Sequence, residues 1–141
     1  MSKIAVVYWS GTGNTETMAS LVAAGAKEAG AETDLFTAGE FGPDRLDAYD
    51  AVAFGCPSMG AEQLEETEFE PMFSSCEGKL AGKRIGLFGS YGWGDGEWMR
   101  TWEDTCRSDG ADLIGPGVIC QEAPDEEAEA ACRDLGKTLA S

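Results

Sequence analysis

The chain has 141 residues, the length of one domain of ordinary size, and 43% of them are hydrophobic against 26% charged. Ten Lys and Arg against 26 Asp and Glu give a net charge of −16, and there is no His. The lack of His excludes a His-based catalytic triad and imidazole ligands to a metal. So negative a charge repels nucleic-acid backbones and anionic membranes, so we expect neither as a partner, and any protein partner should be basic.

The N-terminal residues have neither a long apolar core nor a cleavage site of small residues, so they do not resemble a signal peptide. No stretch approaches the roughly 20 apolar residues that cross a bilayer. The five cysteines are an odd number and form no C-x-x-C pair, which argues against an iron–sulfur cluster, a zinc site or a thioredoxin-type pair. We interpret them as reduced, mostly buried thiols of a cytoplasmic protein.

Short apolar runs alternate with amphipathic segments along the chain. Strands are predicted over 4–9, 32–37, 51–54, 84–88 and 111–121, the last interrupted by Gly115-Pro116-Gly117. One helix follows the first strand and ends at Gly30, with Met18, Leu21, Val22 and Ala29 on its apolar stripe. Another carries Trp98, Trp102 and Cys106 and ends at Gly110, and the last begins at Pro124-Asp125-Glu126-Glu127.

This alternation predicts a single domain over residues 1–141, an α/β/α sandwich of three layers built on a five-stranded parallel sheet. In such folds ligands bind beyond the carboxyl ends of the strands, where the strand order reverses. Function is therefore expected in the loops after the first, third and fourth strands.

The loop after the first strand, Ser10-Gly11-Thr12-Gly13-Asn14-Thr15, is rich in neutral hydrogen-bond donors. Its glycines allow backbone N–H groups to turn inward, and the following helix adds the partial positive charge of its N-terminus. No G-K-[ST] follows, so this is not a Walker A loop, and the third glycine of the dinucleotide fingerprint is missing. The three loops lack Lys and Arg, which favours one phosphate monoester over a nucleoside triphosphate with Mg²⁺.

The other two loops offer walls for a flat ring. In Gly89-Ser90-Tyr91-Gly92-Trp93-Gly94, glycines bracket two aromatic residues, and Trp93 is expected to stack on a heterocycle. In Gly55-Cys56-Pro57-Ser58-Met59-Gly60, the thioether of Met59 can cover the opposite face.

Together, the segments 8–15, 55–60 and 86–94 resemble those of flavodoxins, in particular the short-chain flavodoxins of anaerobic bacteria such as clostridia, in order and spacing over essentially the full chain. The resemblance implies a sheet of order 2-1-3-4-5 and non-covalently bound FMN. It implies a low-potential one-electron carrier that replaces ferredoxin, passes through a neutral semiquinone to an anionic hydroquinone, and is not an enzyme. It also implies transient binding to ferredoxin- or flavodoxin-dependent reductases and oxidoreductases, and a monomer.

By position, the resemblance assigns the phosphate to the first loop, the ribityl chain to Ser58 and Ser90, and the ring faces to Met59 and Trp93. Amides near Gly92 and Gly94 would face the pyrimidine oxygen, and Glu62 would accept from N3–H. A peptide in the turn Met59-Gly60-Ala61-Glu62 would flip on one-electron reduction to accept the proton on N5. Glu122 stands where relatives often place an amide near the ribityl chain. The predicted cofactor-binding residues are Ser10, Gly11, Thr12, Gly13, Asn14, Thr15, Ser58, Met59, Gly60, Ala61, Glu62, Ser90, Tyr91, Gly92, Trp93 and Gly94.

Six glutamates fall between positions 62 and 77, and most of them are expected on a solvated surface. Collectively, such charges make the second reduction unfavourable and steer basic partners to the flavin edge. Two alternatives share the fold. An NAD(P)H:quinone reductase would need a longer chain and a cation for the nucleotide phosphate, and a phosphoacceptor receiver would need acids where Ser10-Gly11-Thr12 stands.

Overall fold

A computed structural model describes residues 2–59, 63–92 and 94–141. Its strands are β1 (Lys3–Tyr8), β2 (Glu32–Thr37), β3 (Ala51–Gly55), β4 (Arg84–Tyr91), β5 (Asp112–Leu113) and β6 (Val118–Gln121). Its helices are α1 (Asn14–Glu28), α2 (Pro43–Leu46), α3 (Phe69–Cys76), α4 (Glu97–Ser108) and α5 (Glu126–Ala140), with single 3-10 turns η1 (Ala38–Glu40) and η2 (Glu77–Lys79).

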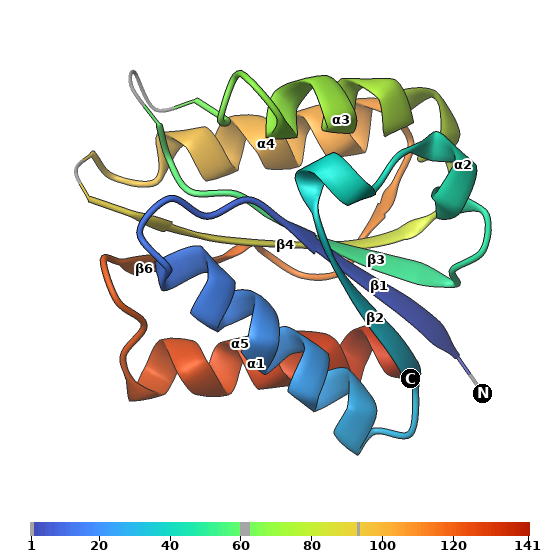
Figure 1. Ribbon diagram of the computed structural model, residues 1–141, viewed down its shortest axis with the longest axis horizontal. Helices are drawn as coiled ribbons and strands as arrows, with labels where there is room; N and C mark the ends of the chain where they lie inside the picture. Colours follow the sequence, from blue (N-terminus) through green and yellow to red (C-terminus); the bar gives the residue numbers. More distant parts are fainter. Residues whose placement is uncertain (1, 60–62, 93) are drawn as a thin grey trace.

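The sheet is parallel, with strand order β2-β1-β3-β4-β5, and β6 also pairs with β4. This confirms the predicted order 2-1-3-4-5. The fifth strand is split as predicted: β5 pairs with the start of β4 and β6 with its end, on either side of Gly115-Pro116-Gly117. Helices α1 and α5 cover one face of the sheet, and α3 and α4 cover the other (Figure 1).

The two faces of the sheet have different cores. Between the sheet and α3 and α4 lies an aromatic cluster that includes Phe54, Phe69, Phe73, Trp98 and Trp102. On the other face, mostly aliphatic residues pack beneath α1 and α5. None of the described helices has the length and apolar character that crossing a membrane requires.

Several predicted boundaries need correction. Strand β4 continues three residues past 88, because β6 pairs with it from Phe88 to Tyr91, so Gly89 and Ser90 are strand residues and not loop residues. Helix α5 begins at Glu126 because Asp125 is its N-cap and accepts from Ala128 N–H at 2.9 Å.

The predicted apolar stripe of α1 is correct for Met18 and Val22, which are fully buried. It is wrong for Ala29, which is exposed just beyond the helix end. Helix α3 was not predicted, since its sequence begins in the run of glutamates.

Candidate functional site

A cavity of about 350 Å³ lies at the carboxyl ends of β1, β3 and β4. Clefts that bind small ligands and cofactors have roughly this size or more. Ten of the predicted residues line it: Ser10, Gly11, Thr12, Asn14, Thr15, Ser58, Met59, Ser90, Tyr91 and Gly92. The cavity therefore lies where the predicted order of strands reverses.

Two further predicted residues, Gly13 and Gly94, are not among the described residues that line this cavity. Gly13 and Gly94 have left-handed backbones, with φ of 99° and 90°, and shape the loops beside it. Gly60, Ala61, Glu62 and Trp93, including the proposed peptide flip and ring stacking, lie outside the described residues.

Two lining residues were not among those predicted. Pro57 could have been found from its place directly before Ser58. Glu122, which the sequence only associated with the ribityl chain, also lines the cavity.

The N-terminus of α1 opens onto the cavity. Gly13 is the N-cap residue, and no side chain of the described residues caps the first turn. The Gly13 N–H donates to Ser10 Oγ at 3.0 Å, which folds the loop back on itself. The first backbone N–H groups of a helix have no partner within the helix and carry its partial positive charge. Because Asn14 and Thr15 line the cavity, this end of α1 is arranged to bind an anion.

Buried hydroxyl groups form part of the cavity lining. Thr15 Oγ1 and Ser90 Oγ lie 3.2 Å apart, and the two residues are 1% and 5% exposed. The Ser58 N–H donates to the Ser90 carbonyl at 3.0 Å. These bonds fix the loop after β1 and the loop after β3 to the end of β4. Among the described residues of the lining there is neither Lys nor Arg, and Glu122 is the charged residue among them.

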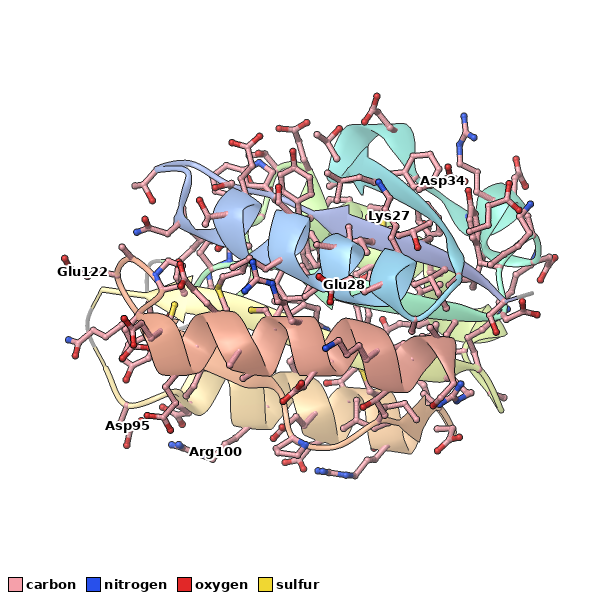
Figure 2. The ribbon with its side chains drawn as sticks, turned by 90° about the horizontal axis from the view of Figure 1, so that it is seen from below. Lys27, Glu28, Asp34, Asp95, Arg100 and Glu122 are labelled. Carbon is pink, nitrogen blue, oxygen red and sulfur yellow. The ribbon has the colours of Figure 1, made fainter. Side chains whose placement is uncertain are left out.

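Glu122 closes the side of the cavity next to β6. Its backbone is left-handed, with φ of 60°, and its N–H donates to the Tyr91 carbonyl at 2.8 Å. The preceding Gln121 donates through Nε2 to the Gly92 carbonyl at 3.4 Å. Figure 2 shows Glu122 and Asp95 at the same end of the molecule, where β4 and β6 finish. Two carboxylates therefore lie close to the loops of the site.

The loop between β3 and α3 is tied down at its base. Cys56 donates its N–H to the Phe88 carbonyl at 3.1 Å, and its own carbonyl accepts from Trp98 Nε1 at 3.1 Å. Gly89 is required beside it, since a Cβ there would lie 2.1 Å from the Cys56 carbonyl oxygen. Burial raises the pKa of the Cys56 thiol to about 12, so this cysteine stays neutral and has a packing role.

Comparison with known proteins gives the family. The sequence model of the family described as "Flavodoxin" matches residues 6–136. The chain is 44% identical to a flavodoxin of Megasphaera elsdenii over 137 residues, which are 97% of this chain and 98% of the relative. It is 45% identical to a flavodoxin of Clostridium beijerinckii over 136 residues, 96% of this chain and 98% of the relative. The chain belongs to the flavodoxin family.

The comparison of structures agrees. The solution structure of two-electron reduced Megasphaera elsdenii flavodoxin superposes with a TM-score of 0.89 over 97% of this chain and 98% of that one, at 44% identity. A flavodoxin from the domain Archaea, 25% identical, gives a TM-score of 0.87 over 98% of this chain and 96% of that one. The predicted family, its short-chain type and the predicted fold are thus confirmed.

Flavodoxins are FMN-binding electron carriers that serve oxidoreductases as redox partners, so this flavodoxin is an electron-transfer protein and not an enzyme. The quinone-reductase alternative finds no support among these relatives. The cavity fits the cofactor in its chemistry: it combines an uncapped helix N-terminus with neutral hydroxyl groups, as one phosphate ester requires.

Proposed function

We propose that the cavity at the start of α1 holds the phosphate of FMN, bound by the hydroxyl and amide groups of Ser10, Thr12, Asn14 and Thr15 and by the backbone amides among them. The uncapped first turn of α1 is the observation that carries this assignment. Hydrogen bonds from neutral donors to a charged acceptor are about twice as strong as those between neutral groups. A phosphate can therefore be held here without a cation, while the absence of a lysine leaves a triphosphate without its usual counter-charge.

The remaining lining residues are assigned to the rest of the cofactor. Ser58 and Ser90 are assigned to the ribityl chain; both line the cavity, and the Ser90 hydroxyl lies 3.2 Å from that of Thr15 in the loop assigned to the phosphate. Met59 and Tyr91 border the region expected to hold the ring. The Tyr91 ring packs against that of Trp98 at a centroid distance of 5.5 Å, which restricts its position. The contacts expected of Gly60, Ala61, Glu62, Trp93 and Gly94 remain predictions.

When bound, FMN supplies the capacity to accept and release electrons one at a time. The chain's own contribution to a low potential is its negative charge of −16. Two unit charges 10 Å apart interact by about 1.7 kcal/mol at an effective dielectric constant of about 20. Each carboxylate at that distance disfavours added negative charge in the cavity by an amount of this order, reduced by salt. The sum of several such contributions supports a strongly negative second potential.

The same charge supports the proposed partners. We infer that the chain acts as a monomer of one domain in the cytoplasm and binds basic reductases and oxidoreductases transiently. The free, buried thiols are consistent with a reducing compartment. Glu122 lines the cavity, and Asp95, which is paired with Arg100 at 3.0 Å, lies at the same end of the molecule (Figure 2). Together with the net charge of −16, the Glu122 carboxylate supports attraction of a basic partner to that end.

A comparison of two ligands tests the assignment. Apoprotein is titrated with FMN and with riboflavin, which lacks the phosphate, and binding is followed by quenching of flavin fluorescence. We expect FMN to bind about a hundredfold more tightly or better, since several hydrogen bonds to a charged group are lost with the phosphate. Equal affinities would show that the phosphate is not held by this loop.

Salt tests the partner assignment. Transfer of electrons from the reduced protein to a basic haem protein is timed as ionic strength rises from about 0.01 M to about 1 M, across which the Debye length shortens from about 30 Å to about 3 Å. We expect the bimolecular rate to fall steeply, with no comparable fall for an acidic acceptor. A salt-independent rate with the basic acceptor would contradict electrostatic steering.

A further inference from the structure

Glu65 is a buried carboxylate in the loop between β3 and α3, and it is 5% exposed. Its Oε1 accepts from the N–H groups of Glu68 at 2.8 Å and Phe69 at 2.9 Å. Its Oε2 accepts from the N–H of Thr67 at 2.9 Å and from the Thr67 hydroxyl. Four donors therefore converge on one side chain at the start of α3.

The backbone of Glu65 is bonded on both sides as well. Its N–H donates to Cys56 Sγ at 3.4 Å, which joins the end of the loop to its beginning. Its carbonyl accepts from the Glu70 N–H at 2.8 Å, within the first turn of α3. Cys56 in turn is held by Phe88 and Trp98, as described above. Glu65 thus connects the base of the loop with helix α3 and, through Cys56, with strand β4.

The same loop carries a lining residue of the cavity. Met59 and Gln63 pair in antiparallel fashion, with N–H to carbonyl distances of 2.8 Å and 3.0 Å in the two directions. Gln63, the partner of Met59, lies two residues before Glu65 in the sequence, so the anchored carboxylate lies directly next to the pair. The loop is closed twice, once at this pair and once between Cys56 and Glu65.

The Glu65 carboxylate differs from an ordinary helix cap because it is buried. An exposed Ser or Asp satisfies the first turn of a helix without burying a carboxylate. Here, among the described residues, no Lys or Arg forms an ion pair with Glu65. Burial by itself would raise the pKa of Glu65, but the hydrogen bonds from Thr67, Phe69 and Glu68 outweigh it and lower the pKa to about 2. The ionised carboxylate is therefore a permanent part of the loop at neutral pH.

We propose that Glu65 is a positioning residue of the FMN site, which holds the Met59–Gln63 pair at the cavity edge by fixing the base of its loop to α3 and Cys56. The inference rests on the proposed function, in which Met59 borders the FMN ring. Loss of the anchor should let the loop leave its position, weaken FMN binding and shift the reduction potentials of the bound cofactor.

Glu65→Gln and Glu70→Gln form a matched pair of test variants. Each removes one negative charge, but Glu70 is exposed on α3 and does not line the cavity. We expect Glu65→Gln to raise the Kd for FMN by tenfold or more, since its amide presents a donor to groups that already donate. Glu70→Gln should stay within about twofold of wild type. In the apoprotein, the Met59 and Gln63 amides should exchange hydrogen faster in Glu65→Gln alone.

Thr67→Val is a second test variant, and it changes no charge. It tests the same contact if Glu65→Gln does not fold. It removes one of the four donors, and we expect a Kd for FMN raised about fivefold, faster FMN release and a measurable shift of both potentials. In a double-mutant cycle with Glu65→Gln, the effect of Thr67→Val should vanish.

The inference is overturned if Glu65→Gln and Thr67→Val lower the melting temperature while FMN affinity, potentials and exchange at Met59 match Glu70→Gln. If wild-type apoprotein itself fails to bind FMN, the proposed function fails first, and the exchange measurement still shows whether Glu65 anchors the loop.

Discussion

The side-chain oxygens of Thr15 and Ser90 lie 3.2 Å apart at the cavity although the two residues are 75 positions apart in the sequence. The contact joins the first turn of α1 to the end of β4, so it links the part of the cavity assigned to the phosphate with the part assigned to the ribityl chain and ring. Both side chains are buried, and each hydroxyl would lose its protein partner if the other were removed.

Thr15→Val should therefore weaken FMN binding by about tenfold, since it replaces the hydroxyl with a methyl group of similar size. It also leaves the Ser90 hydroxyl without this partner, at a cost of about 1–3 kcal/mol in the free energy of unfolding. Fluorescence titration and urea unfolding measure the two effects. Thr17→Val is the control: this hydroxyl donates to the Gly13 carbonyl on the exposed side of the same helix. Equal FMN affinities for the two variants would contradict the role given to Thr15.

Glu77 should make the folded state less stable as pH rises. Burial raises the pKa of its carboxyl, and the neighbouring Asp109 and then Glu70 raise it further, to about 7. Asp109 Oδ2 is itself buried without a hydrogen-bond donor among the described residues. Because the pKa is higher in the folded than in the unfolded chain, the stabilisation is fully present below about pH 4.5 and is lost as pH rises through about 7.

Glu77→Gln should remove this dependence and raise the stability at pH 8 relative to wild type. Urea unfolding of the apoprotein at pH 5, 6.5 and 8 measures it, and we expect the wild-type and variant stabilities to diverge between about pH 4.5 and 7 and to differ by a constant amount above that range. Glu32→Gln, an exposed change of the same charge on β2, is the control for the loss of one negative charge. Parallel pH profiles for wild type and Glu77→Gln would refute the assignment.

The sequence predicted the sheet well because its central strands are continuous apolar runs, and such runs are typical of parallel strands covered on both faces. It also predicted the break between β5 and β6, since Gly115-Pro116-Gly117 cannot continue a ladder. The predicted end of β4, at residue 88, was wrong because glycine is more typical of loops than of strands, and Gly89 was therefore assigned to a loop. Its lack of a side chain is needed for the close approach of the Cys56 carbonyl, a contact between strands that no local pattern reveals.

The site was predictable where its chemistry is local. Loop 10–15 carries its hydroxyl groups and glycines in one stretch, and the cavity brings them together as expected. Glu65 was missed because a glutamate among glutamates is normally solvated. Its burial depends on N–H groups that converge only once α3 has formed. The contacts of Glu122 with Tyr91 depend likewise on the pairing of β6 with β4.

Helices α1 and α5 pack too closely at Gly25 and Gly136 for either glycine to be replaced by alanine without strain. A Cβ on Gly136 would lie 2.0 Å from the Val22 carbonyl oxygen, and one on Gly25 would lie 2.1 Å from that of Arg133. Alanine favours a helix over glycine by about 1 kcal/mol, but the clash with backbone atoms forces the helices apart. We expect Gly136→Ala to lower the free energy of unfolding of the apoprotein, measured in urea, by about 2 kcal/mol or more.

Gly78→Ala is the control for this prediction, since a Cβ there meets nothing within 4 Å. It should leave stability unchanged or raise it by about 0.5 kcal/mol through the loss of freedom in the unfolded chain. If Gly136→Ala is as stable as Gly78→Ala, then α1 and α5 can move apart without a loss of free energy of unfolding, and the prediction is wrong.

The five thiols should be unreactive in the native protein. All are buried, and burial raises the pKa of Cys56, Cys106 and Cys132 to about 12 and that of Cys120 to about 11. Because the thiolate is the nucleophile, at pH 8 a thiol of pKa 12 is ionised to only about one part in ten thousand. Ellman's reagent should label none of them within minutes, and all five in concentrated urea.

The order of labelling on long exposure is also fixed by the structure. Cys120 is 9% exposed and the other four are fully buried, so Cys120 should react first. Its Sγ lies 3.6 Å from Met18 Sδ between α1 and β6, so modification there should separate these elements and expose the remaining thiols. Cys120→Ser should abolish the first phase and delay the rest, as followed by absorbance and by mass of the labelled protein. Prompt labelling of Cys56 would show instead that the base of the β3–α3 loop opens in the native state.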